Sequence, residues 1–257
     1  MLAAIIWGLV QGLTEFLPVS SSGHLVIIPA FLAEMGVEII PPSLAVSAVL
    51  HLGTLVAVLV YYRADVLKVL RFRSDAEGRK IALLVGIGTI PALIGLPLAD
   101  TLDRFQQTVS NVGWALMFTG VVLFVGQRLA TGARSLIEGR VPDSVVVGLA
   151  QAIALIPGVS RSGMTISAAN GRQFDPIESA RFSFLLGIPA IAGGGLSQLL
   201  DLGDEGGFGP ELLLGMVVAG ISGYFAIAFL ISILKRAGLI PFAIYCLLVG
   251  LGTVLFF

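Results

Sequence analysis

A short stretch of sequence that occurs twice constrains the fold of this chain more than any other feature. Residues 11–24 read QGLTEFLPVSSSGH, and residues 151–164 read QAIALIPGVSRSGM. Aligned without gaps, the two regions pair Gly8, Leu9, Gln11, Val19, Ser20, Ser22 and Gly23 with Gly148, Leu149, Gln151, Val159, Ser160, Ser162 and Gly163. Similarity between two distant parts of one chain indicates a duplicated structural unit. We therefore expect a fold built from two related halves.

The differences between the two copies carry the chemistry. The first copy has Glu15, Ser21 and His24, where the second has Leu155, Arg161 and Met164. One loop thus offers a carboxylate, a hydroxyl and an imidazole, and the other offers a guanidinium. We expect the fold to bring these two loops together.

The composition indicates a membrane protein. The chain is 56% hydrophobic and only 12% charged, and its mean hydropathy is +0.99, whereas a soluble domain carries about 25% charged residues. Its repeated apolar runs are long enough to cross a hydrocarbon core of about 30 Å. We predict an all-α polytopic integral membrane protein. The net charge of −1 and the lack of a basic stripe argue against a nucleic-acid partner, and the single Cys246 excludes a disulfide framework or a cysteine metal cluster.

Two segments are too short to cross the bilayer. The first apolar run, 2–16, stops before Pro18, and a helix of that length reaches only about 22 Å. A polar turn and a second short apolar piece, 25–32, follow it. This pattern predicts a re-entrant hairpin over 1–32, and the second copy predicts another over 145–169 with its break at Pro157-Gly158. Irregular backbone at this depth needs protein or water around it.

The remaining apolar runs complete a single membrane domain, 1–257, made of two repeats. In the first repeat, 1–127, spans at 44–62, 81–99 and 111–127 follow the hairpin. In the second repeat, 144–257, spans at 182–200, 212–234 and 238–257 follow the hairpin. Pro91 and Pro189 occupy matching Ile-Pro-Ala contexts, and we expect both to kink their spans.

The basic residues test whether the second hairpin returns to its own side, because Lys and Arg concentrate in cytoplasmic loops. If it returns, one face carries Arg63, Lys68, Arg71, Arg73, Arg79, Lys80, Arg128, Arg134, Arg140, Arg172, Arg181, Lys235 and Arg236. Arg104 then lies on the other face, beside the acidic residues Asp201, Asp204, Glu205 and Glu211. An odd number of spans separates the hairpins, so they enter from opposite faces. This arrangement is an inverted-topology repeat, and such folds place the working site near the midplane.

Two charges occupy places where the bilayer disfavours them. Glu15 lies within an apolar segment, and Arg161 lies in an intramembrane turn. A charge at the centre of a bilayer costs about 2.5–3.5 kcal/mol on insertion scales, so each needs a partner or a wet cavity. A structural salt bridge between the two repeats is one explanation, and a functional site is the other.

The hydroxyl and glycine residues around these charges favour a site. Ser20, Ser21, Ser22 and Gly23 surround one helix start, and Ser160, Ser162 and Thr165 surround the other. Free N–H groups at a helix N-terminus bind anions, and a guanidinium suits phosphate oxygens. Helix capping accounts for one serine in each loop. It does not account for an arginine between two serines.

Several roles remain open within this set. Ser21 could act as a nucleophile, with His24 or Glu15 as its base. His24 could instead be the nucleophile, the acid that protonates a leaving oxygen, or a helix-capping residue. Gln11 lies four residues before Glu15 on one helical face, where it could bond Glu15 or the substrate. For His51 a packing hydrogen bond between helices is the first expectation, and a contact with the site is the second.

These residues resemble those of a known family. The motifs QGLTEFLPVSSSGH and PGVSRSGMT look like the two signature motifs of the bacterial undecaprenyl-pyrophosphate phosphatases of the bacitracin-resistance type. The resemblance covers essentially the whole chain. Lipid phosphatases of the acid-phosphatase superfamily instead need a histidine six residues after the arginine of their SR motif, where this chain has Ser167.

The resemblance implies an enzyme that removes the terminal phosphate of undecaprenyl pyrophosphate to give the lipid carrier of peptidoglycan synthesis. It assigns Glu15 as the motif carboxylate, Ser21 as the candidate nucleophile, His24 as a second catalytic group and Arg161 as the phosphate-binding arginine. Gln11 stands where some relatives have a second glutamate, which argues against a mechanism that needs two carboxylates.

The resemblance also implies a location and a cofactor. We expect the bacterial inner membrane, with the cavity opening to the outer face, and a polyprenyl diphosphate substrate. A divalent ion such as Mg²⁺ is expected, held mainly by the pyrophosphate, with Glu15 as the one side chain that could add a ligand.

Other functions fit parts of the pattern. Inverted repeats with broken helices are typical of secondary transporters, so the chain could be a transporter or a flippase of a lipid phosphate, alone or combined with phosphatase activity. A structural assembly subunit would leave Glu15, Ser21 and Arg161 without a purpose. The sequence leaves a homo-oligomer open.

Overall fold

The computed structural model of this chain describes residues 1–37, 39, 42–199 and 209–257. Over these residues the fold is helical, without a β-strand, and an isolated bridge joins Arg134 to Phe174. The predicted acidic loop, with Asp201, Asp204 and Glu205, lies outside the described residues, as does the end of the predicted span 182–200. The expectation of an all-α fold with apolar helices is confirmed.

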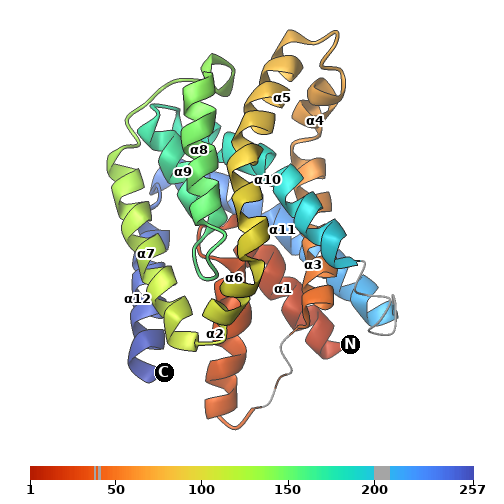
Figure 1. Ribbon diagram of the computed structural model, residues 1–257, viewed down its shortest axis with the longest axis vertical. Helices are drawn as coiled ribbons and strands as arrows, with labels where there is room; N and C mark the ends of the chain where they lie inside the picture. The colour runs from red at the N-terminus through yellow and green to blue at the C-terminus, as the bar shows by residue number, and fades with distance from the viewer. Residues whose placement is uncertain (38, 40–41, 200–208) are drawn as a thin grey trace.

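The helices of the first half lie close to the predicted segments, with two additions. They are α1 (Leu2–Phe16), α2 (Ser21–Glu34), α3 (Leu44–Tyr61), α4 (Arg63–Leu70), α5 (Ala76–Thr89), the 3-10 helix η1 (Ile90–Leu98), α6 (Ala99–Gln106) and α7 (Val109–Arg128). Helices α4 and α6 were not predicted, and they lie toward opposite ends of the molecule in Figure 1. Helix α4 bends by 85° from α3.

The second half begins with a short 3-10 turn and contains the second pair of short helices. Its elements are η2 (Leu136–Glu138), α8 (Val141–Ile153), α9 (Arg161–Gly171), α10 (Pro176–Leu199), α11 (Pro210–Arg236) and α12 (Ile240–Phe256).

The expected span over 81–99 is interrupted. The α-helix ends at Thr89, and residues 90–98 form η1, which contains Pro91 and Pro97. A proline inside a helix removes an N–H donor and clashes with the carbonyl four residues earlier, so two prolines this close do not allow a regular α-helix to continue. In contrast, α10 continues through Pro189.

Among the described helices, α7 and α11 are each long and apolar enough to cross a bilayer. The bent pair of α3 and α4 makes a third candidate if it counts as one span. Helices α1, α2, α8 and α12 are apolar but shorter. This pattern fits a multi-pass membrane protein that combines full spans with partial ones.

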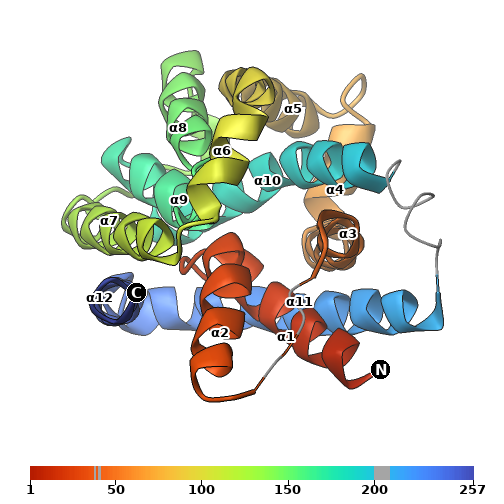
Figure 2. The ribbon, with the colours of Figure 1, turned by 60° about the horizontal axis from the view of Figure 1, so that its bottom comes forward.

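The two short helix pairs meet in the interior. In Figure 1, α8 and α9 extend from the centre of the molecule toward the top, whereas α2 extends from the centre toward the bottom. Helix α11 packs against α1 and α3, and α12 packs against α7, as Figure 2 also shows.

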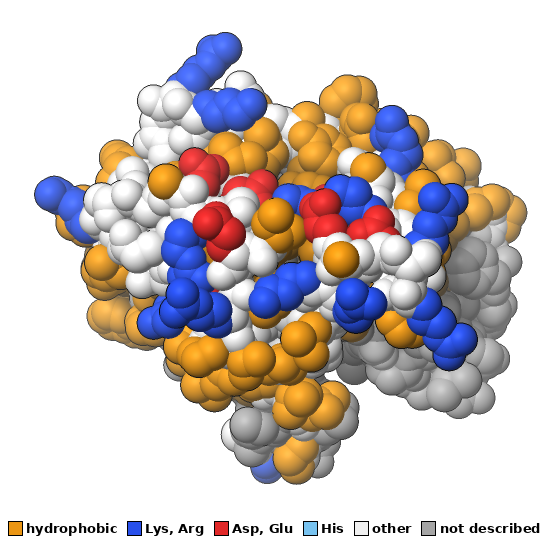
Figure 3. Space-filling view, turned by 90° about the horizontal axis from the view of Figure 1, so that it is seen from above, with side chains coloured by type: hydrophobic (Ala, Val, Ile, Leu, Met, Phe, Trp, Pro, Cys, Tyr) orange, Lys and Arg blue, Asp and Glu red, His pale blue; other side chains and the backbone are white. Residues whose placement is uncertain are grey.

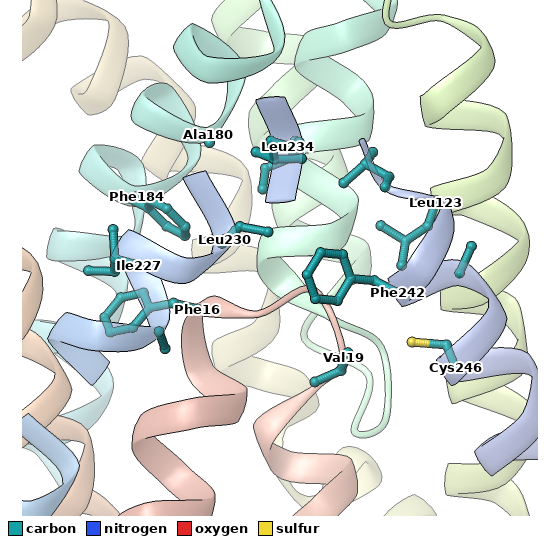
Figure 4. Close-up of a cluster of buried hydrophobic side chains, with 14 of the residues drawn as sticks. Phe16, Val19, Leu123, Ala180, Phe184, Ile227, Leu230, Leu234, Phe242 and Cys246 are labelled. Carbon is teal, nitrogen blue, oxygen red and sulfur yellow. The ribbon is translucent and has the colours of Figure 1, made fainter. Parts of the chain in front are cut away.

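An apolar cluster supports the turn between α1 and α2. Phe16 and Val19 come from this turn, and they pack with side chains of α10, α11 and α12 that include Phe184, Leu230 and Phe242 (Figure 4). The Phe16 and Phe184 rings meet edge to face with centroids 5.4 Å apart. Burial of this cluster fixes the end of α1, and with it the position of Glu15.

Charged residues gather at one end of the molecule. Figure 3 views the end at the top of Figure 1 and shows Lys and Arg side chains around a smaller acidic group. Asp65 of α4 accepts a hydrogen bond from Arg181 of α10 at 2.6 Å. Asp143 of α8 lies 2.8 Å from both Arg134 and Arg172. These ion pairs join the ends of helices from both halves of the chain.

Candidate active site

The turns between the paired helices touch each other. The backbone N–H of Gly158, in the second turn, donates to Ser22 Oγ at 3.3 Å. Ser162 Oγ, at the start of α9, donates to the carbonyl oxygen of Leu17 at 3.2 Å. The expected meeting of the two loops is therefore present.

Each turn begins a helix in the same way. The side chain of Ser20 accepts from the N–H of Gly23 at 3.2 Å, and that of Ser160 accepts from the N–H of Gly163 at 3.1 Å. Both serines are thus N-caps, which satisfy one of the free donors of the first helical turn. Ser20 has a φ of 69°, which is uncommon for a residue with a side chain and sets the sharp entry into α2.

Glu15 lies at the centre of the site, and its side chain is almost fully buried. Its Oε2 accepts from Ser21 Oγ at 2.6 Å and from Gln11 Nε2 at 3.0 Å. Its Oε1 accepts from Arg161 Nη2 at 2.9 Å. Residues from α1, α2 and α9 therefore share one carboxylate, and Gln11 occupies the helical position expected from its spacing.

Arg161 keeps hydrogen-bonding capacity beyond this ion pair. Its Nη1 is buried and has no hydrogen-bond partner. The guanidinium lies against Gly187 of α10, where any Cβ would overlap Nη1. A buried donor without a partner is costly. Arg161 also lines the cavity, where an anion would gain a charge-assisted bond from the guanidinium.

A cavity of about 350 Å³ opens over these groups. Its polar lining consists of Thr14, Glu15, Ser20, Ser21, Ser22, His51, Ser160 and Arg161. Its other lining residues are Ala154, Leu155, Val159, Ala190, Ile191, Gly194 and Gly195. Polar groups that converge beside an apolar wall suit a ligand with a charged head and an apolar tail.

His24 faces away from the cavity. Its Nδ1 lies 2.7 Å from the carbonyl oxygen of Ser20. A carbonyl only accepts, so Nδ1 carries the hydrogen and the neutral Nε2 accepts from Tyr245 Oη at 2.7 Å. The two rings stack with centroids 5.7 Å apart. Of the roles open for His24, this geometry favours the structural one at the start of the helix over the catalytic ones. The Tyr245 contact, which was not predicted, also joins the start of α2 to α12.

His51, and not His24, is the histidine that lines the cavity beside Glu15. It lines the cavity from α3, and its Nε2 is 3.6 Å from Glu15 Oε2. Its Nδ1 is 2.8 Å from the carbonyl oxygen of Ser47 in the preceding turn. This position fits the second expectation for His51, a contact with the site, and not the first, a packing bond between helices. The sequence signal was a histidine within an apolar run.

The other candidate residues support the turns without lining the cavity. Thr165 Oγ1 donates to the carbonyl of Arg161 at 2.8 Å and lies 2.6 Å from Ser183 Oγ. Ser162 bonds across to the first turn, and Gly23 donates to the N-cap. Gln11 reaches the site through Glu15, and its own Oε1 is buried without a partner.

The described residues do not fit a metal site held by protein side chains. No group of three or more His, Cys, Asp or Glu residues is placed to bind an ion in the described part of the chain. Glu15 already accepts bonds at both oxygens, from Arg161 and from Ser21 with Gln11. Mg²⁺ prefers oxygen ligands in an octahedron, and this single, fully engaged carboxylate offers no such set.

Comparison with known proteins gives full-length matches. The profile of the family described as "Bacitracin resistance protein BacA" matches residues 4–252. The "Undecaprenyl-diphosphatase" of Halothermothrix orenii is 38% identical over 255 residues, covering 98% of this chain and 96% of the relative. That of Desulforudis audaxviator is 42% identical over 255 residues, covering 97% and 95%. The "Undecaprenyl-diphosphatase 4" of Bacillus thuringiensis is 36% identical over 258 residues, covering 99% and 95%.

Proposed function

This chain belongs to the bacitracin resistance protein BacA family, and from that premise we propose that it is an undecaprenyl-diphosphatase. The reaction removes the terminal phosphate of undecaprenyl diphosphate and leaves the monophosphate carrier. One observation carries the proposal: Glu15 is bonded at the same time to the Ser21 hydroxyl and the Arg161 guanidinium, which come from the two opposed hairpins and line one cavity.

Arg161 and the helix starts bind the diphosphate. Phosphoryl transfer depends mainly on neutralising charge and on positioning the reacting groups. Arg161 supplies a fixed positive charge with an unused donor at Nη1. The N-termini of α2 and α9 both point into the region where the turns meet, and their partial positive charge adds to that of the guanidinium.

Ser21 attacks the terminal phosphorus, and Glu15 orients its hydroxyl. The distance of 2.6 Å between Ser21 Oγ and Glu15 Oε2 is that of a strong hydrogen bond to a carboxylate. An adjacent base is what a serine needs to act as a nucleophile. The prenyl monophosphate leaves, and water then releases phosphate from the serine. His24 positions the start of α2.

A divalent ion would be held mainly by the substrate, because the described side chains offer no set of ligands for it. The diphosphate has the oxygen ligands that Mg²⁺ prefers, and an ion bound there would neutralise part of its charge.

The chain lies in the inner membrane as an inverted-topology repeat, with its cavity open to the outer face. The opposed directions of the two helix pairs in Figure 1 support this arrangement. The basic face seen in Figure 3 supports a cytoplasmic location for that end.

Phosphate release by purified protein in detergent tests the function. Wild type should hydrolyse undecaprenyl diphosphate without a sealed membrane, whereas a transporter or flippase needs two compartments to show activity. Ser21→Ala should bind the lipid as wild type does and lose at least about 10³-fold in kcat, because the nucleophile is missing. Equal rates from wild type and Ser21→Ala would remove Ser21 from the reaction.

A further inference from the structure

We propose that His51 accepts the proton that Ser21 loses, through Glu15, so that Ser21, Glu15 and His51 act as one proton relay. The inference rests on the phosphatase function proposed above and assigns to this site a residue outside both loop motifs. Its starting point is geometric: Glu15 Oε2 is bonded to Ser21 Oγ at 2.6 Å and faces His51 Nε2 at 3.6 Å.

The hydrogen bond at the other ring nitrogen sets the state of His51. Its Nδ1 lies 2.8 Å from the Ser47 carbonyl oxygen, which can only accept, so Nδ1 carries a hydrogen whether the ring is neutral or charged. In the neutral ring, Nε2 is therefore a free acceptor that faces Glu15. A separation of 3.6 Å is longer than a hydrogen bond, and catalytic contacts of this kind shorten when the substrate binds.

Glu15 needs such a partner because its ion pair with Arg161 makes it a poor final acceptor of the proton from Ser21. The ion pair with Arg161 Nη2 at 2.9 Å favours the ionised carboxylate. A proton taken from Ser21 would cancel that pairing and leave the buried guanidinium without its counter-charge. Transfer of the proton to His51 restores the carboxylate beside Arg161.

The surroundings of His51 leave Glu15 and Arg161 as the charges that act on it. Helix α1 presents Glu15, and α9 presents Arg161. At this depth α10 contributes Ala190 and Ile191 to the cavity. The charged groups on the other helices packed against α3 lie toward the helix ends. Arg181 of α10 pairs with Glu178 and with Asp65 of α4, and Glu211 of α11 pairs with the N-terminus. Lys235 and Arg236 are exposed in the last turn of α11. Tyr224 of α11 packs against Tyr61, at the end of α3.

The steps balance in atoms and charge. In the first step, Ser21 Oγ bonds to the terminal phosphorus, the bridging P–O bond breaks with its electron pair on the prenyl phosphate, and the serine proton reaches His51 Nε2. In the second step, water oxygen bonds to phosphorus and the P–Oγ bond breaks. Ser21 Oγ then recovers its proton from His51, and both hydrogens of the water leave on the phosphate.

Replacement of His51 tests the relay in the intact protein. His51→Gln and His51→Ala should lower kcat by about 10²-fold, the usual contribution of a proton-transfer group, with KM within about threefold of wild type. The matched control is Thr54→Val, one turn along α3. It removes the Thr54 hydroxyl, which donates to the His51 carbonyl at 2.8 Å. This control should keep both kcat and KM.

Two further readouts separate proton transfer from a structural role. Measured from about pH 5 to 8, the ratio of kcat/KM between wild type and His51→Gln should rise with pH, because only a neutral imidazole can accept the proton; titration of the substrate cancels in this ratio. Added imidazole should restore several-fold activity to His51→Ala, because the His51 side chain borders the open cavity. It should not affect Thr54→Val.

Specific outcomes would overturn the relay. A constant ratio across this pH range would do so, as would wild-type kcat in both His51 variants. A raised KM with unchanged kcat would make His51 a phosphate ligand instead. If wild type itself released no phosphate, the proposed function would fail before the relay came into question.

Discussion

At the scale of single residues, the site depends on one buried carboxylate that several groups share. Glu15 would destabilise an apolar helix if it were alone. Here Arg161 balances its charge, while Ser21 and Gln11 complete its hydrogen bonds. The same contacts that make burial of Glu15 tolerable also place a hydroxyl and a guanidinium at the cavity where we propose that the diphosphate binds.

Arg161→Lys tests whether the shape of the guanidinium matters in addition to its charge. Lysine can pair with Glu15 as a point charge, but it cannot present a second fixed donor to phosphate. We expect kcat/KM to fall by about 10²-fold or more, a loss of about 3 kcal/mol in transition-state binding. The control is Arg236→Lys at the exposed end of α11, which should leave phosphate release unchanged. Equal activity in wild type and Arg161→Lys would show that charge alone suffices.

The sequence predicted Glu15, Ser21 and Arg161 as a group because the two charges are unusual in apolar surroundings and Ser21 lies in the same duplicated motif. A charge inside an apolar run and an arginine between serines in a duplicated motif are visible without coordinates. The roles of the histidines were not visible in this way. His24 is in the motif, yet its ring turns toward Tyr245, and His51 reaches Glu15 from a different helix. The direction in which a histidine ring points depends on how the helices pack against one another, and a local sequence pattern does not determine that packing.

At the scale of elements, the hairpin turns are held by contacts to full-length helices. The ring of His24 joins the start of α2 to α12 through Tyr245. This contact gives His24 a structural role although it lies close to Ser21, the proposed nucleophile. Loss of this contact should lower the thermal stability of the protein more than it lowers kcat.

Tyr245→Phe tests this structural assignment. The variant keeps the stacked ring and removes the hydroxyl that donates to His24 Nε2 at 2.7 Å. A buried acceptor left without a donor costs about 1–3 kcal/mol, so thermal unfolding in detergent should occur at a lower temperature. We expect kcat to stay within about threefold of wild type, since proton-transfer groups contribute at least about 10²-fold. A large loss of kcat in a protein of normal stability would return His24 to the chemistry.

Asp143 holds the charged ends of the second hairpin together. Burial raises the pKa of its carboxyl, but hydrogen bonds from Arg134, the Arg140 backbone and Arg172 outweigh burial and lower the pKa below its ordinary value. A lowered pKa in the folded state means that the stabilisation is present above the ordinary aspartate value of about 3.9. It is lost as the pH falls through the lowered folded value.

Asp143→Asn should therefore destabilise the protein at neutral pH. The expected cost is about 1–3 kcal/mol, because two partly exposed arginines lose their shared negative charge and one of its two acceptor oxygens becomes an NH₂ donor. The difference in melting temperature between the variant and wild type should shrink as the pH is lowered toward 3. Glu34→Gln at the exposed end of α2 serves as the control and should not change stability. A constant difference at all pH values would contradict the charge-based explanation.

The helix pattern was more predictable than its interruptions. The bounds of α1 match the predicted segment 2–16, since the length of the apolar run and Pro18 define them. The bend between α3 and α4 and the 3-10 stretch at residues 90–98 were not predicted. The prolines at residues 90–98 indicated locally that the helix would be interrupted there. The bend between α3 and α4 depends instead on the packing of α4 along α5 at the charged end, which is a tertiary contact.

At the scale of the whole molecule, the proposed topology has two hairpins that enter the membrane from opposite faces. Cysteine accessibility tests this arrangement in cells. On a Cys246→Ser background, Met35→Cys should react with an impermeant maleimide added outside. Arg73→Cys and Arg236→Cys should react only after the membrane is opened, because Lys and Arg mark the cytoplasmic face. All three native side chains are exposed. Labelling of Arg236→Cys from outside would mean that the second hairpin crosses the membrane.

The central claim is that groups from the two hairpins form one catalytic unit, and a double-mutant cycle on phosphate release in detergent tests it most directly. Wild type, Glu15→Gln, Arg161→Ala and the double variant would be compared by kcat/KM with undecaprenyl diphosphate. Residues that act as a unit are strongly non-additive, so the double variant should be about as slow as the slower single variant. Two independent losses that multiply in the double variant would contradict a shared site.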